Sequence, residues 1–447
     1  MKGKTEEAAW KLSEQDSNHR KKGKLSSAHT KAVRGGPVNV PFYKIMEGTT
    51  IAVDAFKYGK IPNITAYFLS HAHADHYTRL SHTWEYGLIY CSQTTANLIC
   101  HNLGVKKQWV RPLKNEEPTM VDGVKVTLLD ANHCPGSSMF LFEGIKQPQG
   151  IPYRYLHCGD FRASPQMIRK LDNKKIDICY LDTTYLNPKY CFPAQEQVIN
   201  ACSDLFQMGT KADSLKTKDD SVLVLVGTYT IGKERIVKQI AKAIGSKIYC
   251  DTRKSLIFKC IVDDPELHQL MTDDPFKAQV HVTNLFAIKH EMLEEYLRRF
   301  RGHFTHIIGL RPTGWTYKPD EISTTVSGLT SIAKVLEMYA TSNQSKHIPG
   351  GSNPLVNFNQ TCLYPQRDST ERCQAFGVPY SEHSSFYELT CFCVSMDWVR
   401  IIPTVNCGSP ASRAKMKSWF ERWQVERKRR IEANLSTFIE PRTESYW

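Results

Sequence analysis

The 447-residue sequence lacks a hydrophobic run long enough to cross a membrane: its longest, Val222 to Val226, is far shorter than the roughly 20 residues required. No charged segment followed by an apolar stretch opens the chain, so we expect no secretory signal. The 14 cysteines include no Cys-x-x-Cys pair. We therefore expect reduced thiols, mostly buried as small hydrophobic groups, in a cytosolic or nuclear protein.

The composition is that of a globular protein, with 41% hydrophobic and 23% charged residues. It excludes a wholly disordered chain, a collagen and a coiled coil, and the length predicts more than one domain. The net charge is +13, and Lys and Arg concentrate in residues 1–38 and 411–430. Basic ends favour a polyanion or a nuclear import receptor, the alternative being solvated tails. The cluster Arg20-Lys21-Lys22-Gly23-Lys24 favours import into the nucleus, and we expect the C-terminal helix to contact DNA.

The chain divides into segments of different pattern. Residues 1–37 are polar and basic without apolar periodicity, which predicts a disordered arm. Short strands follow to about 195, and units of strand, turn and helix continue to about 339. Strand patterns return near 374–380 and 398–405, before a charged helix at 410–434 and a tail at 435–447. The clearest strand predictions before these are 65–69, 87–91, 124–129, 138–143, 153–157, 176–181 and 222–226.

The densest group of potential ligands is the string His71-Ala72-His73-Ala74-Asp75-His76, directly after an apolar strand. Residues two apart on an extended segment point the same way, so His71 and His73 can share one ion. Imidazole nitrogens and carboxylate oxygens suit zinc, and Asp75 with His76 can hold a neighbouring ion. A lone histidine would more often be a surface or core residue, but four such residues in six positions predict a metal site.

Two further motifs follow apolar strands and end in glycine-containing turns. One, residues 130–136, carries His133, and the other, residues 157–161, carries Asp160. Such turns deliver side chains to the edge of a sheet, where the Asp160 carboxylate can bridge two ions. Two ions about 4 Å apart stabilise the attacking and leaving oxygens of a phosphodiester displacement. These residues therefore favour metal-assisted hydrolysis of phosphodiesters.

Several motifs resemble a known family. The His/Asp string, residues 131–136 and residues 159–162 resemble the metallo-β-lactamase fold. Residues 181–185, 251–254 and 379–385 resemble its β-CASP branch, and within it the DNA interstrand cross-link repair nucleases related to Artemis and Apollo. The resemblance extends over roughly residues 38–410. It implies an α/β protein: a discontinuous αββα metallo-β-lactamase domain with an inserted α/β β-CASP domain.

The resemblance implies domain boundaries and metal ligands. The metallo-β-lactamase domain would comprise 38–195 and 376–434, the latter including the basic helix, with the β-CASP insert at 196–375. A first zinc ion would be bound by His71, His73, His133 and Asp160. A second divalent ion, whose occupancy we leave open, would face Asp75, His76 and Asp160. Asp54 matches an acid that orients a ligand histidine.

The resemblance also assigns catalytic residues. Asp75 and Asp160 would act at the metal centre, while Asp182 and His383 would form a proton-handling pair, with His383 protonating the leaving oxygen. The alternative for Asp182 is a residue that ends a strand. RNA-cleaving members carry a histidine where this chain has Val405, and the DNA-processing subfamily carries valine there. Val405 therefore favours DNA as substrate and weakens the second ion site.

Residues 227–234 match the P-loop spacing, but Glu234 replaces the Ser or Thr that would hold magnesium, which disfavours nucleotide hydrolysis. A glycine turn opening a helix still exposes N–H groups to phosphate, so we expect Gly232 and Lys233 to contact the DNA backbone. The alternative is a helix start with a solvated lysine. Trp315 is expected to stack a base, unless it is buried. Further phosphate contacts are expected from Arg253, Lys254, Ser381, Ser384 and Ser385.

The metal-ligand pattern together with the resemblance thus implies a zinc-dependent 5′ to 3′ DNA exonuclease of the nucleus that acts in interstrand cross-link and strand-break repair. Its partners would be DNA that is single-stranded or has a free 5′ end, and repair proteins, with no membrane. One alternative is an RNA-processing endonuclease, which Val405 disfavours. A non-catalytic DNA-binding scaffold would have lost ligands that this chain retains, and a small-molecule hydrolase would not need the insert. Residues 1–37 contain no cysteine, so we expect no N-terminal zinc finger.

Overall fold

The computed structural model describes Trp10 and residues 39–209, 221–317, 331–341 and 358–447. The predicted N-terminal arm lies outside the described residues except for Trp10. The Trp10 indole is buried, with ring centroids 4.7 Å from Phe42 and 5.6 Å from Tyr43, and the Arg413 guanidinium lies 4.6 Å from it. The prediction of a disordered arm did not include this packing of Trp10 against the first domain. None of the described helices is long and apolar enough to span a membrane.

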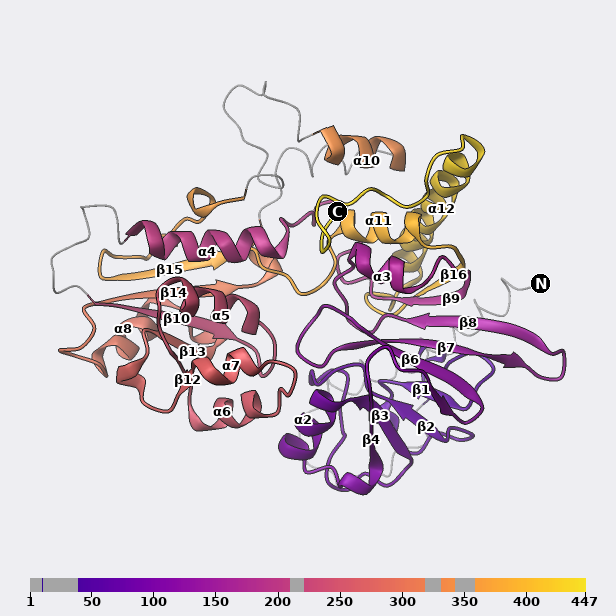
Figure 1. The fold of residues 1–447 in the computed structure, drawn as a ribbon, viewed down its shortest axis with the longest axis horizontal. Helices are drawn as coiled ribbons and strands as arrows, with labels where there is room; N and C mark the ends of the chain where they lie inside the picture. Colours follow the sequence, from indigo (N-terminus) through magenta and orange to yellow (C-terminus); the bar gives the residue numbers. More distant parts are fainter. Residues whose placement is uncertain (1–9, 11–38, 210–220, 318–330, 342–357) are drawn as a thin grey trace, which may run out of the picture.

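The first half of the chain builds two sheets that face each other (Figure 1). One is parallel, in the order β1 (Ile51–Val53), β2 (Ala66–Phe68), β3 (Leu88–Ser92) and β4 (Val110–Leu113). The other has the order β16 (Trp398–Pro403), β9 (Ile176–Leu181), β8 (Ile151–His157), β7 (Ser138–Lys146), β6 (Val124–Asp130) and β5 (Thr119–Val121). The strand predictions in this region are confirmed. β16 comes from the far end of the chain and pairs in parallel with β9, so the domain is discontinuous.

Helices cover the outer faces of both sheets. α2 (Gln93–Leu103) packs on the first sheet and begins at Ser92, whose Oγ accepts the Thr95 N–H at 3.2 Å. α3 (Pro165–Lys170), α11 (Phe386–Ser395) and α12 (Pro410–Glu432) pack on the second. Between the sheets lies an aromatic core that includes Phe68, Phe140, Phe142, Tyr155 and Tyr180. The predicted αββα fold is confirmed.

A second domain is inserted between β9 and β16 (Figure 1). Its parallel sheet has the order β12 (Met271–Thr272), β11 (Ile248–Tyr249), β13 (Val280–Asn284), β10 (Val222–Thr228), β14 (His306–Pro312) and β15 (Cys373–Val378). Its helices are α4 (Gln195–Gly209), α5 (Glu234–Ala243), α6 (Thr252–Lys259), α7 (Pro265–Leu270) and α8 (His290–Arg298). Short 3-10 helices in the two domains are Phe42–Lys44, Phe56–Tyr58, Lys107–Trp109, Pro275–Lys277, Leu285–Ala287, Gly314–Thr316 and Gln360–Cys362.

The boundaries of the insert differ from the predicted 196–375. Its last strand, β15, continues to Val378. α10 (Ile332–Thr341), although inside the predicted insert, packs on α11 and α12, and Ile332, Val335 and Leu336 join the core of the first domain. The reason is that an apolar helix is recognisable in a sequence, whereas the domain that covers its apolar face is set by tertiary packing.

The C-terminal segment is packed against the first domain. In the predicted tail, Ile439, Tyr446 and Trp447 are buried, and the Trp447 indole donates to the Ile439 carbonyl at 3.0 Å. Arg429 and Arg430 donate to the buried Glu426 of the same helix. Arg427 donates to the Val394 carbonyl at 3.1 Å. Acceptors within the domain thus engage these three arginines, and contact of the helix with DNA stays a prediction.

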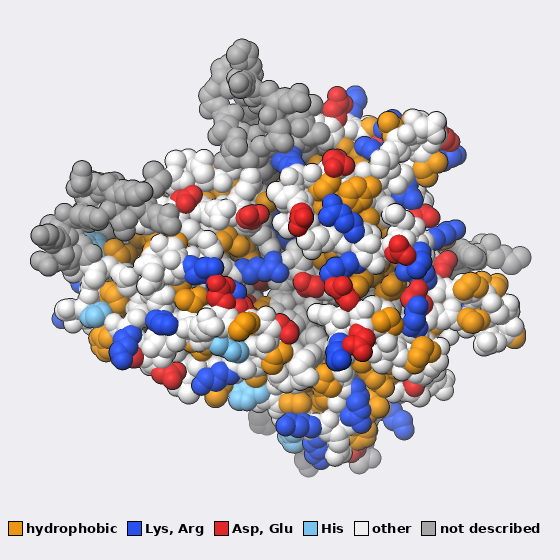
Figure 2. Space-filling view, viewed as in Figure 1, with side chains coloured by type: hydrophobic (Ala, Val, Ile, Leu, Met, Phe, Trp, Pro, Cys, Tyr) orange, Lys and Arg blue, Asp and Glu red, His pale blue; other side chains and the backbone are white. Residues whose placement is uncertain are grey.

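Basic and acidic side chains are interspersed over the face shown in Figure 2. On the insert, for example, Lys238 lies 2.7 Å from Asp264, and Lys242 lies 2.7 Å from Glu266. The net positive charge of the chain therefore does not appear on this face as a patch of one sign.

Candidate metal centre

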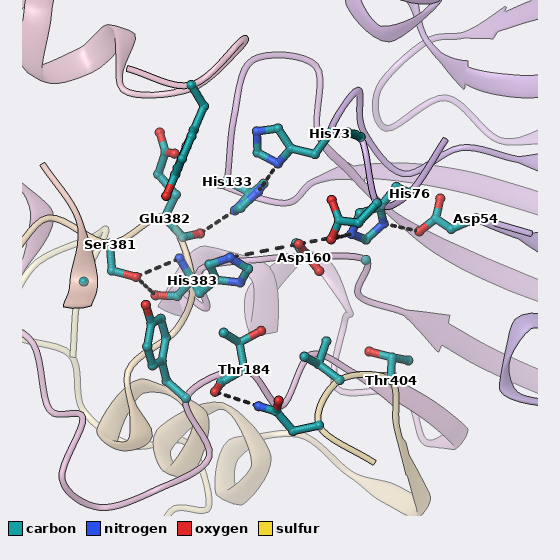
Figure 3. Close-up of a pocket in the computed structure, with 18 of the residues that line it drawn as sticks. Asp54, His73, His76, His133, Asp160, Thr184, Ser381, Glu382, His383 and Thr404 are labelled. Atoms are coloured by element: carbon teal, nitrogen blue, oxygen red, sulfur yellow. Dashed lines mark hydrogen bonds and ion pairs between the residues drawn. The ribbon is translucent and has the colours of Figure 1, made fainter. Parts of the chain in front are cut away.

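A cleft of about 820 Å³ opens between the two domains, and both domains line it. The αββα domain contributes the loop after β2 with His73, Asp75 and His76, the β6–β7 turn with His133, and the β8–β9 turn with Asp160. From the insert come the turns after β10 and β14, and His383 follows β15 (Figure 3). Nearly all of these residues follow the carboxyl end of a strand, so the sheets bring residues distant in sequence to one place.

Three imidazoles converge at the floor of the cleft. The His71 Nε2 atom lies 2.8 Å from His73 Nδ1, and His133 Nε2 lies 3.1 Å from the same atom. His71 and His133 are buried, and His73 is half-buried. The structure therefore brings together the three histidines that the sequence assigned to the first ion.

The partners on the far side of each ring determine which nitrogen carries the proton. His73 Nε2 lies 3.0 Å from the Ile231 carbonyl oxygen, and His133 Nδ1 lies 2.8 Å from the Glu382 carbonyl oxygen. Ser70 Oγ donates to Asp54 and so accepts from His71 Nδ1, 2.9 Å away. Because a carbonyl oxygen only accepts, the protons lie on these outer nitrogens.

The inner nitrogens of all three rings consequently present lone pairs to one another. Burial lowers the pKa of His73 and of His133, which favours the neutral form of both rings. Neutral nitrogens that face each other at about 3 Å without a proton repel, unless a cation lies between them. Imidazole nitrogens beside a carboxylate are the ligands that zinc and similar divalent ions prefer. The donor set therefore fits a metal ion.

Asp160 lies where it can contact both proposed ions. Its Oδ2 atom is 3.7 Å from His71 Nε2 and 3.2 Å from His76 Nε2. These three residues form one group that could hold a metal, and His133, Asp160 and His383 form another, with ligand atoms within 4.8 Å of one another in each group. Asp75 has an exposed side chain, and its Oδ2 lies 3.6 Å from His76 Nε2 at the rim.

Asp54 supports this centre from behind. Its Oδ2 accepts from His76 Nδ1 at 2.7 Å, and its Oδ1 accepts the Ser70 N–H at 2.8 Å. Burial raises the pKa of Asp54, but the charge and hydrogen bond of His76 outweigh it and lower that pKa to about 2. The ionised carboxylate thus orients His76 with Nε2 toward Asp160, as the resemblance led us to expect.

Cys134 is a residue that the sequence analysis did not select. Its sulfur belongs to a group of potential ligand atoms with His71, His73 and His133. Burial raises the pKa of its thiol well above the ordinary value in the absence of a metal, and a bound metal would deprotonate the thiol. Cys134 is therefore a further candidate ligand beside the three histidines. Its position next to His133 in the sequence was the signal that could have drawn attention to it.

His383 and Asp182 form a pair on the opposite wall of the cleft. His383 Nδ1 lies 2.8 Å from Asp182 Oδ2, and His383 Nε2 faces Asp160 Oδ2 at 4.0 Å. Burial lowers the pKa of His383, but Asp182 outweighs it and raises the pKa to about 8. Asp182 also accepts the Thr184 N–H at 2.9 Å in the turn after β9. It therefore makes the contacts that both interpretations require, and its catalytic role stays a prediction.

The residues of the glycine turn and Lys254, for which phosphate contacts were predicted, bind other groups of the protein in this structure. Gly232 N–H donates to Glu234 at 2.9 Å, Lys233 Nζ donates to Glu382 at 2.9 Å, and Lys254 Nζ donates to the Tyr229 carbonyl at 2.7 Å. Lys233 is also buried. The sequence indicated a turn able to bind an anion, but the anion bound there is a carboxylate of the protein itself.

The serines around His383 are also structural. Ser381 Oγ binds the backbone of His383, and Ser384 Oγ donates to the Phe161 carbonyl at 2.9 Å. Ser385 caps α11 in a capping box with Glu388. Both Ser381 and Ser384 are buried, and their contact with phosphate stays a prediction. Arg253 is exposed, and its contact with DNA stays a prediction.

A two-sheet αββα domain with a His/Asp cluster at its loop ends, covered by an inserted α/β domain, defines a metallo-β-lactamase protein of the β-CASP type. Residues 51–210 match the family described as "Beta-lactamase superfamily domain", and residues 265–409 match "DNA repair metallo-beta-lactamase". The chain belongs to the DNA repair metallo-β-lactamase family of cross-link repair proteins. Membership implies a divalent metal, for which the cluster supplies the ligands.

Three relatives illustrate this membership. "DNA cross-link repair protein pso2/snm1" of Schizosaccharomyces pombe is 45% identical over 87% of this chain and 66% of its own length. "DNA cross-link repair protein SNM1" of Arabidopsis thaliana is 36% identical over 87% of this chain and 70% of its own. "5' exonuclease Apollo" of Gallus gallus is 33% identical over 56% of this chain and 50% of its own. The chain thus spans just under two thirds of the fission yeast protein.

Because Asp160 lies at the centre of the cluster and Asp75 at its rim, we expect their alanine variants to differ in how well they retain metal. Asp160→Ala should leave the chain folded but unable to retain metal through gel filtration, because Asp160 approaches both His71 and His76. Asp75→Ala should retain an ion, because the three converging imidazoles and Asp160 remain. Metal per chain, measured by atomic emission, with circular dichroism as the folding control, checks this. An Asp160→Ala protein with the parent's metal content would contradict it.

Proposed function

We propose that this chain is a zinc-dependent DNA nuclease that acts as a 5′ to 3′ exonuclease in interstrand cross-link and strand-break repair in the nucleus. The observation that carries the proposal is the set of inward lone pairs of His71, His73 and His133 beside Asp160, in an open cleft between two domains. The relatives are named as cross-link repair proteins and a 5′ exonuclease, which supports DNA as the substrate and 5′ to 3′ as the polarity.

The residues around the cleft have distinct roles in this chemistry. Bound divalent ions would polarise a phosphodiester and offset the negative charge that develops during its hydrolysis. His71, His73, His133, His76 and Asp160 would hold them. Asp182 accepts from His383 Nδ1, which leaves Nε2 directed at the cleft. Nε2 is therefore the atom that can pass a proton to the leaving oxygen.

The other walls of the cleft suit a nucleic-acid strand. Trp315 is 66% exposed and lines the cleft, and its ring lies 5.4 Å from that of Tyr185. The Tyr185 ring in turn lies 5.9 Å from the His383 ring. An exposed indole next to the reacting groups is a surface on which an unpaired base can stack. Val405 also lines the cleft, and by the resemblance this valine favours DNA over RNA.

The direct test is digestion of matched substrates by the purified chain. Single-stranded DNA with a 5′ phosphate, the same strand with a 5′ hydroxyl, a DNA hairpin and an RNA strand of the same sequence are compared with and without chelator. We expect DNA to be shortened from its 5′ end, the activity to be lost with chelator and to return with zinc. Cleavage of RNA in preference to DNA, or DNA cleavage that survives chelation, would refute the proposal.

His383→Ala should lower turnover by about 10²–10⁴, the usual contribution of a general acid, while DNA affinity and metal content change little. Asp182→Asn should act in the same direction, because it weakens the hold on His383 Nδ1. Single-turnover rates, DNA binding and metal per chain separate the possibilities. Loss of metal together with activity would make His383 a ligand, and unchanged turnover would remove it from the mechanism.

Trp315→Ala should weaken binding of single-stranded DNA by about 1–3 kcal/mol, the usual contribution of a stacked base, without loss of metal. Phe286→Ala is the matched control, since Phe286 is 64% exposed on the same domain but is not part of the cleft lining. Fluorescence anisotropy with a labelled strand measures both. Equal affinities for the two variants would show that Trp315 does not stack on the substrate.

A further inference from the structure

The turn after β10 is joined to the segment before His383 by a single buried carboxylate. Glu382 Oε2 accepts from Lys233 Nζ at 2.9 Å, and Glu382 Oε1 accepts from the Lys233 N–H at 2.7 Å. The side chains of Lys233 and Glu382 are 4% and 5% exposed. The Glu382 carboxylate thus binds both the ammonium group of Lys233 and the backbone of the turn. A buried pair of this kind has no water to replace either partner.

The same two segments carry the acceptors that orient two of the metal-binding histidines. His73 Nε2 donates to the carbonyl of Ile231, two residues before Lys233. His133 Nδ1 donates to the carbonyl of Glu382 itself, as Figure 3 shows. Both histidines belong to the metallo-β-lactamase domain. Their acceptors lie on the insert and on the segment that returns from it.

Gly232 is required for this close approach. Its φ is +107°, a backbone conformation that residues with a side chain rarely adopt, and a Cβ added there would lie 2.8 Å from Glu382 Oε2. The glycine that matched the P-loop spacing therefore makes room for the Glu382 carboxylate. A glycine at position 232 is therefore explained by the contact of this turn with Glu382.

We infer that the Lys233–Glu382 pair is a positioning device for the metal centre. It holds the turn of the insert and the His383 segment where the Ile231 and Glu382 carbonyls orient the rings of His73 and His133 with their inner nitrogens aimed at one another. The insert thus contributes to metal binding as well as to the cleft wall. This inference rests on the proposed metal centre but not on the nature of the substrate.

Metal affinity tests this inference without any nucleic acid. Zn²⁺ and Co²⁺ dissociation constants are measured by chelator competition for the parent chain, Lys233→Met and Gly232→Ala, together with the Co²⁺ absorption spectrum. Partners that orient a ligand histidine typically contribute about 10–100-fold in metal affinity, so both variants should bind that much more weakly with an altered spectrum. Lys233→Arg, which keeps the charge, should recover most of the affinity.

Two matched controls come from the same helix region. Lys238 on α5 lies 2.7 Å from Asp264 and 3.3 Å from Glu266, so Lys238→Met removes an ion-paired lysine away from the cleft lining. Gly245 has φ +66° and nothing within 4 Å of an added Cβ, so Gly245→Ala introduces backbone strain without a clash. Both controls should bind metal as the parent does.

The outcomes separate this inference from the proposed function. If the parent binds no metal, the metal centre and this inference both fail. If the parent binds metal and folded Lys233→Met and Gly232→Ala bind equally well, this inference alone fails. Glu382→Gln, which keeps the side-chain volume, replaces Lys233→Met if that variant does not fold. Unfolding of all of these variants while the controls fold would overturn the inference in favour of a purely structural pair.

Discussion

The structure of the site depends on keeping three unprotonated imidazole nitrogens pointed at one another in a buried place. Left alone, His71, His73 and His133 would rotate or take up a proton, since their inner nitrogens approach to 2.8 and 3.1 Å. An acceptor behind each ring prevents this: Ser70 Oγ, the Ile231 carbonyl and the Glu382 carbonyl. Ordered polar groups from three distant segments of the chain thus hold this arrangement of the three rings. A cation bound between the inner nitrogens would stabilise it.

This constraint accounts for the division of the chain into two domains. The αββα domain supplies all the proposed ligands on loops at strand ends, which are rigidly held by an aromatic core between the sheets. The insert supplies the turn that contacts His73 and the exposed Trp315 of the cleft wall. By the inference above, one interface between the domains serves both the cleft and the geometry of the metal centre.

Much of the fold could be predicted because its signals are local. Apolar strands such as Val124–Asp130 and Ile176–Leu181 are confirmed, and so is the discontinuous αββα domain. The partners of Lys233, Lys254, Ser381 and Ser384 within the protein were not predicted, for one shared reason. Each was expected to contact phosphate because of its residue type and its neighbours in the sequence. In the structure each donates a hydrogen bond to a carboxylate or a backbone carbonyl of the protein itself.

The sequence by itself determined the elements, the ligand-bearing strings and the order in which they occur, because hydrophobic period and turn residues act over a few positions. Only the tertiary structure decided which donor meets which acceptor. Lys233 and Glu382 are 149 positions apart, and His133 and Glu382 are 249 apart. No local pattern records such a pairing, because it arises when two domains close over one buried carboxylate. As a result, the glycine turn after β10, which the sequence suggested for phosphate, instead helps to orient His73 and His133.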